Sequence, residues 1–310
     1  MATSYVEIPN NFAEAELFVE TDPAICADLI LKARVCFFYD TCSFRLHSHM
    51  PHVESLLEYI ANKGGIIVIT RCILMELASC SGYLNQEYLT YMKKISNYGI
   101  SLLVIYEEDI FKLMNLCFSG HAVINDYLCW AVWLLIQNPV TAVCEILDRN
   151  RSLSERVISG KNISDGRLYT DFFSTVRQEK QSGDSMGEEL LAICLYILTH
   201  HPMAKDGKFC MVTEDKGALR KFKLILEKVS KWHSGRAMIL YSTPKLIQQM
   251  YRERILNEKD TIEEMLLALG KGNIAVFGTR PQDMCVKEIS LSSRELAEKI
   301  ASPNEININF

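Results

Sequence analysis

The sequence predicts an α/β fold built around a central parallel sheet. Residues 35–39 (Val-Cys-Phe-Phe-Tyr) are a continuous apolar run, which is typical of a strand buried on both faces. Comparable runs follow at residues 66–69 and 100–106, and helical spacing of apolar residues separates them at residues 51–62 and 72–79. This alternation of strands and helices implies parallel strands joined by right-handed crossovers.

The rest of the chain extends this pattern. The first thirty residues have apolar positions at helical spacing, and residues 108–148 indicate two or three helices broken at Gly120 and at residues 138–139. Residues 149–167 are polar and predict an exposed loop. Further helices are predicted at residues 169–180, 188–198, 217–230, 244–256, 262–269 and 291–301, and further strands at residues 208–212, 237–241, 274–277 and 284–289.

The predicted domain organisation has two parts. Residues 1–243 form one domain, within which residues 107–181 are a helical insertion. Residues 244–310 form a C-terminal α+β extension whose role the sequence does not indicate. With 310 residues, of which 49% are hydrophobic, the chain can bury a sizeable core.

Cysteine usage indicates a cytoplasmic setting. The eleven cysteines include no CxxC pair, and several lie within apolar runs, as free cysteines do in a reducing compartment. No signal peptide is expected in residues 1–18, and the apolar stretch at residues 127–136 is about half as long as a membrane-spanning helix. A core or interface helix is therefore expected there, and no membrane partner. The net charge of −5 argues against broad nonspecific binding to nucleic acid.

Five acidic residues stand where the predicted elements would bring them together. Asp40 ends the first strand, Glu76 lies on the helix after the second strand, and Asp215 follows the fourth strand. Asp184 and Glu188 begin the long apolar helix before that strand. Ligands bind beyond the carboxyl ends of parallel strands. Carboxylates gathered there repel one another, and a divalent cation removes this repulsion, so the pattern predicts a Mg²⁺ or Mn²⁺ site.

Each acid taken alone also has a structural explanation. Asp40 and Asp215 stand where helix caps are common, and Glu76 could lie on a solvated helix face. Asp184 could cap the helix that follows it, so we favour Glu188 as the metal ligand and Asp184 as a second contributor. The three histidines His47, His49 and His52 have no metal-binding spacing and are expected in a loop.

The arrangement of these acids resembles that of the PIN-domain nucleases. The resemblance covers residues 33–242 and rests on the strand followed by Asp40-Thr41, the Glu76 helix, Asp184…Gly187-Glu188, and Thr213-x-Asp215. It implies a Rossmann-like three-layer α/β/α sandwich, Mg²⁺ or Mn²⁺ as the cofactor, and RNA as the usual substrate. The family's catalytic acids map onto Asp40, Glu76, Glu188 (or Asp184) and Asp215. The long helical insertion and the C-terminal extension depart from typical small members of the family.

The reaction expected from this resemblance is hydrolysis of a phosphodiester by a metal-activated water. Asp40, Glu188, Asp215 and Asp184 are the expected metal ligands. Hydroxyl and basic residues near the acids are candidates for substrate contacts: Thr41, Thr213, Lys216 and Arg220. The basic pair could equally lie on a solvated helix face. Single-stranded DNA is a second expected substrate.

Two other functions compete with a nuclease. An aspartyl phosphatase of the haloacid dehalogenase type needs a second aspartate two residues after the first, and this chain has Cys42 there. A non-catalytic PIN-like module is the main alternative, because the helical insertion and its apolar stretch at residues 127–136 could bind a protein or RNA partner or form a homodimer.

Overall fold

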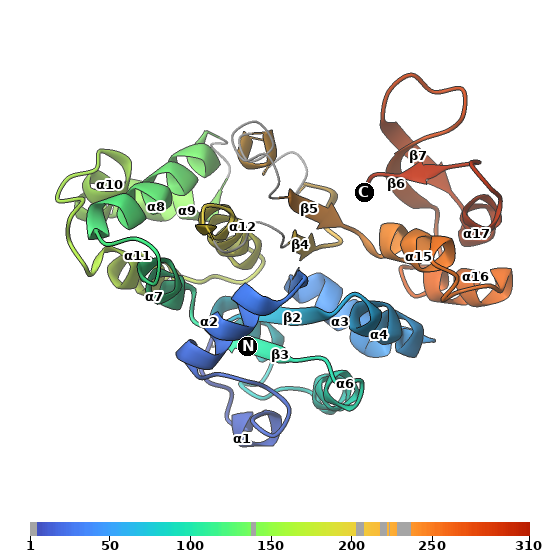
Figure 1. The fold of residues 1–310 in the computed structure, drawn as a ribbon, viewed down its shortest axis with the longest axis horizontal. Helices are drawn as coiled ribbons and strands as arrows, with labels where there is room; N and C mark the ends of the chain where they lie inside the picture. The colour runs from blue at the N-terminus through green and yellow to red at the C-terminus, as the bar shows by residue number, and fades with distance from the viewer. Residues whose placement is uncertain (1–4, 138–140, 203–207, 218–221, 223, 228–236) are drawn as a thin grey trace.

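The computed structural model describes the chain apart from residues 1–4, 138–140, 203–207, 218–221, 223 and 228–236. Its centre is a parallel five-stranded sheet with the strand order β3-β2-β1-β4-β5 (Figure 1). The strands are β1 (Val35–Tyr39), β2 (Gly65–Thr70), β3 (Leu102–Ile105), β4 (Lys208–Val212) and β5 (Ala237–Tyr241). The predicted α/β fold with a central parallel sheet is therefore confirmed.

Successive side chains of each strand enter two separate cores, which makes the fold a three-layer sandwich. In β1, Cys36 and Phe38 belong to one core, and Phe37 and Tyr39 belong to the other. The helices of the first core are α2 (Pro23–Lys32), α7 (Ile110–Asn115), α8 (His121–Ile136), α9 (Ala142–Arg149), α10 (Arg151–Ile158), α11 (Leu168–Gln178) and α12 (Met186–Thr199). Those of the second core are α1 (Phe12–Ala15), α3 (Thr41–His49), α4 (Val53–Asn62), α6 (Gln86–Asn97), α15 (Thr243–Arg252), α16 (Lys259–Leu267) and α17 (Ser293–Ala301).

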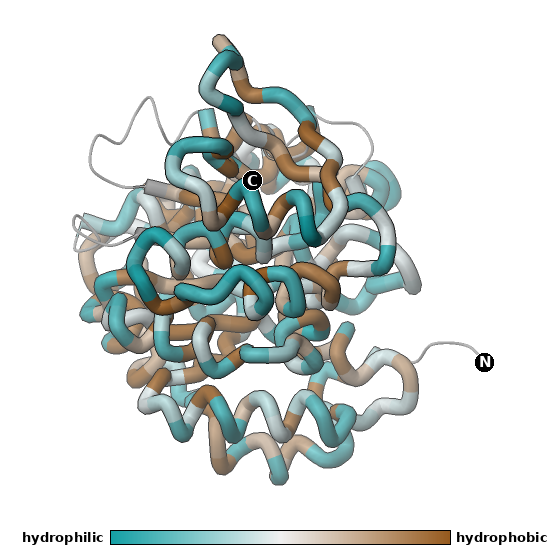
Figure 2. The backbone as a smooth tube through the Cα atoms, turned by 90° about the vertical axis from the view of Figure 1, so that its right-hand side faces the viewer, coloured by the Kyte–Doolittle hydropathy of each residue, from teal (hydrophilic) through white to brown (hydrophobic). Residues whose placement is uncertain are grey.

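Turns of several helices alternate between hydrophilic and hydrophobic segments in Figure 2, as expected for helices that cover a core. Burying a residue such as Phe37 contributes roughly 1.5–3 kcal/mol, so the two cores are the main source of stability. Within the described ranges, no helix is both long enough and apolar enough to cross a membrane.

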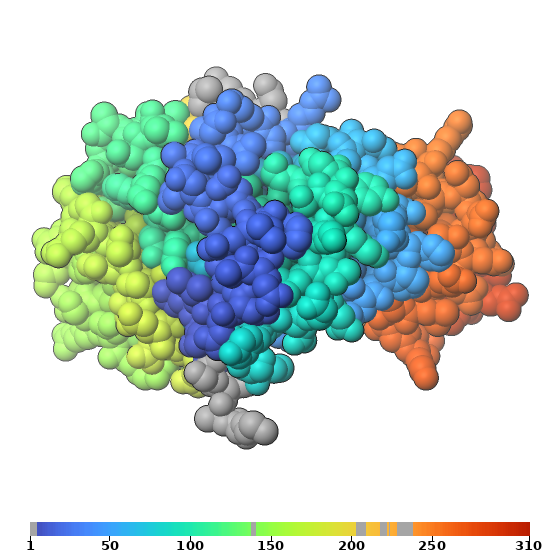
Figure 3. All heavy atoms as spheres, turned by 90° about the horizontal axis from the view of Figure 1, so that it is seen from below, coloured from blue at the N-terminus to red at the C-terminus, as the bar shows by residue number. Residues whose placement is uncertain are grey.

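The helical insertion follows β3 and begins with a short 3₁₀ helix, η1 (Glu107–Asp109). It occupies one side of the molecule, drawn green to yellow in Figures 1 and 3. The exposed loop predicted at residues 149–167 is present only from residue 159 onward, because α10 occupies residues 151–158. Leu153 and Val157, four residues apart, are the buried positions of this helix. These two apolar residues form the only buried face of a helix whose other residues are mostly polar.

A buried ion-pair cluster joins the beginning of the insertion to its end. The guanidinium of Arg177 on α11 binds Glu107 at 2.6 Å and Glu108 at 2.5 and 2.8 Å. Arg177 is 2% exposed and Glu107 is 0% exposed. The second oxygen of Glu107 accepts a hydrogen bond from the backbone N–H of Cys72, which starts α5 (Arg71–Leu77). The cluster therefore fixes both ends of the insertion against the helix that carries Glu76.

The predicted C-terminal extension contains a small antiparallel sheet of β6 (Ile274–Thr279), β7 (Lys287–Leu291) and β8 (Asn307–Ile308) in the order β7-β6-β8. The predicted strand pair is present, although its second strand begins three residues later than expected. Leu246 and Ile247 of α15 join the core that contains Phe37 and Tyr39, so the extension packs on one face of the central sheet. It forms the orange-to-red side of the molecule in Figures 1 and 3.

Candidate active site

Asp40 lies at the carboxyl end of β1, in the middle of the sheet. Its backbone N–H donates to the carbonyl oxygen of Val212 on β4 at 3.0 Å. Its side chain caps α3, because Oδ1 accepts a hydrogen bond from the backbone N–H of Ser43 at 2.6 Å. Asp40 is 0% exposed, and Oδ2 has no hydrogen-bond partner among the described residues. Burial raises the pKa of Asp40 to about 6, although the nearby Thr213 and Ser43 oppose this change.

Glu76 lies on α5 and faces Asp40. The hydroxyl of Thr41 donates to Glu76 Oε2, and the carboxylate charge of Glu76 contributes to the raised pKa of Asp40. On its other side, Glu76 Oε1 is 3.0 Å from the ammonium of Lys180. Thr41 and Glu76 were both predicted as site residues, and the structure joins them by this direct hydrogen bond.

Lys180 is a member of the site for which the sequence gives no local signal. Its side chain is 2% exposed, and its ammonium pairs with both Glu76 and Asp184. The Asp184 carboxylate also accepts backbone hydrogen bonds from Gln181 at 2.7 Å and from Met186 at 3.1 Å. Burial acts to lower the pKa of Lys180, but the two carboxylates outweigh burial and raise this pKa above its ordinary value. Asp184 is thus a loop-ordering residue bound to a cationic side chain.

Glu188 stands in the first turn of α12, close to the other acids. Its charge, with those of Asp40 and Glu76, acts on the thiol of Cys42. Desolvation and these three carboxylates raise the pKa of Cys42 to about 12. Asp40, Glu76 and Glu188 therefore all lie near enough to Cys42, on the first turn of α3, to act on its thiol. The neighbouring Glu189 faces elsewhere and accepts backbone hydrogen bonds at the start of α9.

Asp215 and Thr213 follow β4, the strand next to β1. Because Asp40 and Val212 are hydrogen-bonded neighbours, Asp215 lies at the same edge of the sheet as Asp40. Thr213 is 0% exposed, and its hydroxyl accepts a hydrogen bond from the backbone N–H of Asp215 at 3.0 Å. Asp215 Oδ1 in turn accepts from the backbone N–H of Gly217 at 2.7 Å. This turn orders the carboxylate immediately after the strand.

The two predicted basic contacts have different outcomes. Lys216 is exposed and lies 4.0 Å from Glu288, a weak surface ion pair. Arg220 lies outside the described residues, as does part of the helix predicted at residues 217–230.

A buried polar chain connects this edge of the sheet to the core. Thr243 donates to Glu214 Oε1 through both its backbone N–H, at 2.9 Å, and its hydroxyl, at 2.5 Å. Since the hydroxyl proton of Thr243 is used in this bond, His47 Nε2 must donate to Thr243 Oγ1, 2.8 Å away. His47 Nδ1 then accepts from the Tyr39 hydroxyl at 3.1 Å. The expectation that His47 lies in a loop is wrong, because it is fully buried on α3.

Burial strongly shifts the pKa values of the ionisable side chains in this buried polar chain. Burial lowers the pKa of His47 to about 3, so the imidazole is neutral at pH 7. Burial raises the pKa of Glu214 to about 7, and the charge of Asp40 adds to this effect against the hydrogen bonds from Thr243. Asp40 and Glu214 follow the neighbouring strands β1 and β4, and their carboxyl groups are therefore electrostatically coupled.

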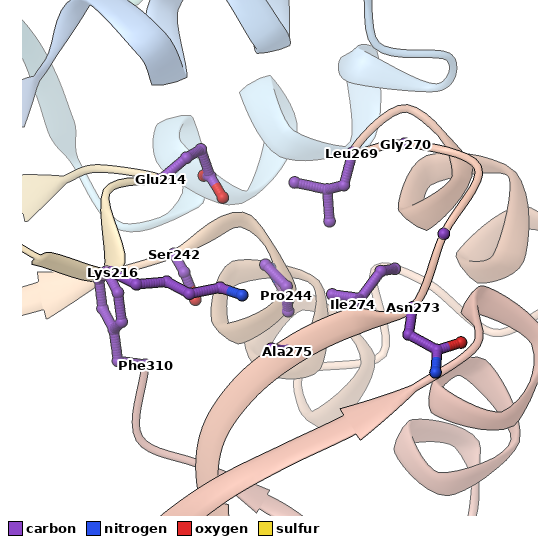
Figure 4. A pocket seen from close by; sticks show the side chains of 11 residues that line it. Glu214, Lys216, Ser242, Pro244, Leu269, Gly270, Asn273, Ile274, Ala275 and Phe310 are labelled. Carbon is purple, nitrogen blue, oxygen red and sulfur yellow. The ribbon is translucent and has the colours of Figure 1, made fainter.

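A pocket of about 220 Å³ lies beside Glu214, between the central sheet and the C-terminal extension (Figure 4). The side chain of Lys216 extends into it towards Pro244, and Glu214 and Asn273 stand at its rim. Its lining residues are Glu214, Lys216, Ser242, Pro244, Leu269, Gly270, Gly272, Asn273, Ile274, Ala275 and Phe310. The hydroxyl of Ser242 is buried there without a hydrogen-bond partner in the described structure.

The described acids do not form a complete metal-binding group as they stand. No three His, Cys, Asp or Glu side chains in the described part of the chain are arranged so that they could hold a metal ion. The donor set nevertheless suits a hard cation such as Mg²⁺, which takes one or two carboxylates and keeps several waters. The buried Oδ2 of Asp40, without a hydrogen bond in the described structure, is the best-placed donor atom for such an ion.

Gly187 lets α12 approach the Glu76 side chain closely. A Cβ atom at this position would lie 2.7 Å from Glu76 Oε1 and 2.8 Å from Ile73 Cδ1. We expect Gly187→Ala to displace Glu76 and to destabilise the protein by about 1–3 kcal/mol. Urea unfolding measures this change. Gly120→Ala is the control, because a Cβ at Gly120 meets nothing within 4 Å. Equal stability of the two variants would contradict this packing.

Comparisons of the chain with protein-family models, with curated protein sequences and with solved structures find no match.

Proposed function

We propose that this chain is a Mg²⁺- or Mn²⁺-dependent nuclease that hydrolyses phosphodiester bonds in RNA, with single-stranded DNA as a second substrate. The observation that carries the proposal is the buried Asp40 at the carboxyl end of the central strand, with the charges of Glu76 and Glu188 beside it. The likeness of these positions to the PIN-domain acids supports the same function. A cytoplasmic location fits the eleven cysteines, all of which are free.

Asp40, Glu188 and Asp215 are the residues that would hold the ion. When bound, the ion would activate a water molecule and neutralise the charge that develops on the phosphate. Asp184 is the weaker candidate, because Lys180 and two backbone N–H groups already bind its carboxylate. The choice between Asp184 and Glu188 therefore falls on Glu188.

The remaining residues of the site bind and orient. Thr41 fixes the Glu76 carboxylate through its hydroxyl, and Thr213 orders the turn that carries Asp215. Lys216 lies one residue beyond Asp215 and is half exposed, so its ammonium can reach a phosphate of a bound strand. The carboxylates at this edge of the sheet would repel a phosphate on their own. The edge would therefore bind an anion only after a cation has neutralised them.

Cleavage of labelled single-stranded RNA and DNA with Mn²⁺, and with EDTA in its place, tests the proposal. We expect cleavage only with Mn²⁺, and we expect Glu188→Gln to lower the rate about 100-fold or more, because it removes a ligand charge. Glu145→Gln is a matched control, since Glu145 is also a glutamate in the first turn of a helix but is exposed on the insertion. Its rate should equal that of the wild type.

Absence of cleavage together with absence of Mn²⁺ binding in calorimetry would favour the alternative, a non-catalytic interaction module. One observation supports that alternative. Trp130 and Trp133 on α8 are 46% and 40% exposed and line a second pocket of about 280 Å³. Large exposed aromatic residues are typical of a protein-binding or dimer surface. A protein partner or a homodimer bound at the insertion is compatible with either function.

A further inference from the structure

The pocket beside Glu214 is built from both predicted parts of the chain. Glu214, Lys216 and Ser242 come from the part that contains the central sheet, and the other lining residues come from the C-terminal extension. The extension, for which the sequence indicates no role, thus completes a cavity of about 220 Å³ (Figure 4). A cavity closed by two packed layers is a common place for a small-molecule site.

Ser242 contributes a buried hydroxyl that has no use within the described structure. Its side chain is 5% exposed, and Oγ has no hydrogen-bond partner among the described residues. Ser242 directly precedes α15, but its side chain does not cap this helix. A buried hydroxyl without a partner is energetically unfavourable, and a bound acceptor would remove this cost. The hydroxyl therefore points to a ligand that carries a hydrogen-bond acceptor.

Lys216 adds a positive charge to the same pocket. Its side chain extends into the pocket towards Pro244 (Figure 4). The ion pair between Lys216 and Glu288 is 4.0 Å long, and about half of each side chain is exposed. Such a pair is weak, so the ammonium can also bind a negatively charged ligand. The hydroxyl and the ammonium together favour an anionic acceptor.

The number of donors favours a carboxylate over a phosphate. The start of α15 adds little, because the N–H of Thr243 already donates to Glu214 and Pro244 has no N–H. Lys216 and Ser242 then supply one donor group each, which matches the two oxygens of a carboxylate. When ionised, Glu214 would also repel a doubly charged phosphate more strongly than a singly charged carboxylate.

Most of the remaining lining is apolar and suits the body of an organic ligand. The apolar residues are Pro244, Leu269, Ile274, Ala275 and Phe310. Apolar walls with a few polar groups are typical of sites that bind and orient small molecules. We propose that this pocket binds a small monocarboxylate with an apolar body. Lys216 and Ser242 bind its carboxylate, and the extension covers its body. The proposal does not depend on the proposed nuclease activity.

Equilibrium dialysis of the full chain with radiolabelled phenylacetate, in EDTA, tests the proposal. We expect saturable binding of one phenylacetate per chain, with a Kd of about 1 mM or tighter. Lys216→Met and Ser242→Ala should each weaken binding about tenfold, because each removes one donor to the carboxylate. Unlabelled 2-phenylethanol, which has a hydroxyl in place of the carboxylate, should compete about tenfold less well than unlabelled phenylacetate.

Lys161→Met and Ser174→Ala are the matched controls. Lys161 is an exposed lysine that pairs with Glu155, and the Ser174 hydroxyl donates to the carbonyl oxygen of Thr170 in an exposed hydrogen bond. Neither residue lines the pocket, so both variants should bind phenylacetate like the wild type.

Four results would overturn the proposal. They are no saturable binding by the wild type, equal binding by the wild type and both pocket variants, equal competition by 2-phenylethanol and phenylacetate, and equal competition by inorganic phosphate and phenylacetate. The last result would make the pocket a phosphate site instead. Ser242→Ala removes a hydroxyl without a partner in the described structure and should fold normally, so it decides even if Lys216→Met does not fold. None of these results bears on metal-dependent cleavage, which is measured separately.

Discussion

Asp40→Asn is expected to lower the rate of Mn²⁺-dependent RNA cleavage by roughly a thousandfold. A bound metal contributes several kcal/mol to stabilising a phosphoryl transition state, and each 1.4 kcal/mol or so corresponds to a factor of ten. The asparagine keeps the shape of the side chain and still accepts the hydrogen bond from Ser43, so it removes only the charge that would hold the ion. The measurement is the single-turnover rate with Mn²⁺ in excess.

The same substitution should stabilise the metal-free protein at neutral pH. The pKa of Asp40 is about 6 in the folded chain, above its ordinary value of 3.8, so ionisation of this carboxyl opposes folding. The cost is absent below pH 3.8, grows as the pH rises towards 6, and is complete above it. Each pKa unit represents about 1.4 kcal/mol, so the full cost is about 3 kcal/mol. Urea unfolding in EDTA should show Asp40→Asn more stable at pH 7.5 and equal to the wild type at pH 4.

Asp22→Asn is the control for both measurements. Asp22 also caps a helix, because its side chain accepts from the backbone N–H groups of Ala24 and Ile25, but unlike Asp40 it is exposed. Asparagine and aspartate are about equally good caps, so neither activity nor stability should change. Full activity of Asp40→Asn would contradict the proposed site. A loss of stability at pH 7.5 would show instead that Asp40 is a structural cap.

Arg177→Met should destabilise the protein by about 3–5 kcal/mol, because it leaves the buried carboxylate of Glu107 without its partner. The guanidinium makes close contacts with Glu107 and Glu108 and is 2% exposed, so solvent cannot replace it. A loss of this size is a large share of the 5–15 kcal/mol that stabilises a typical domain. The measurement is the free energy of unfolding in urea at pH 7.

Arg149→Met supplies the comparison, since Arg149 also forms an ion pair within the insertion. Its partner is Glu179 at 3.5 Å, and the two side chains are 55% and 48% exposed. Exposed pairs of this kind contribute about 0–1 kcal/mol. Similar losses for Arg177→Met and Arg149→Met would mean that the buried cluster does not hold the insertion.

The central sheet was predictable because its strands carry a strong signal. Strands buried on both faces need uninterrupted apolar runs, and this chain has them at residues 35–39 and 66–69. No helix is predicted at residues 86–97, where α6 forms, because polar residues interrupt its apolar positions. The helix α10 was missed within the predicted loop at residues 149–167 for the same reason. Only two of its residues are buried, and its stability comes from packing on neighbouring helices.

The position of the candidate site was predictable, but its internal contacts were not. Asp40 and Asp215 end neighbouring parallel strands, and topology alone places such residues at one edge. Lys180 follows the end of α11 and Glu76 lies on α5, and nothing near either residue in the sequence signals their contact. The hydrogen bond between His47 and Thr243 joins positions 196 residues apart in the same way. Glycine within a helix often marks a close approach, and Gly187 on α12 is such a glycine.

The Arg177 cluster also determines how freely the insertion can vary in length. The ion pair between Glu107 and Arg177 brings the two ends of the intervening segment together, so this segment is a closed loop. The entropy of closing a loop grows only with the logarithm of its length, by about 0.6 kcal/mol for each doubling. Adding or deleting a helix within the loop therefore changes the cost of closure very little. Loop closure therefore sets little limit on the length of the segment between β3 and β4.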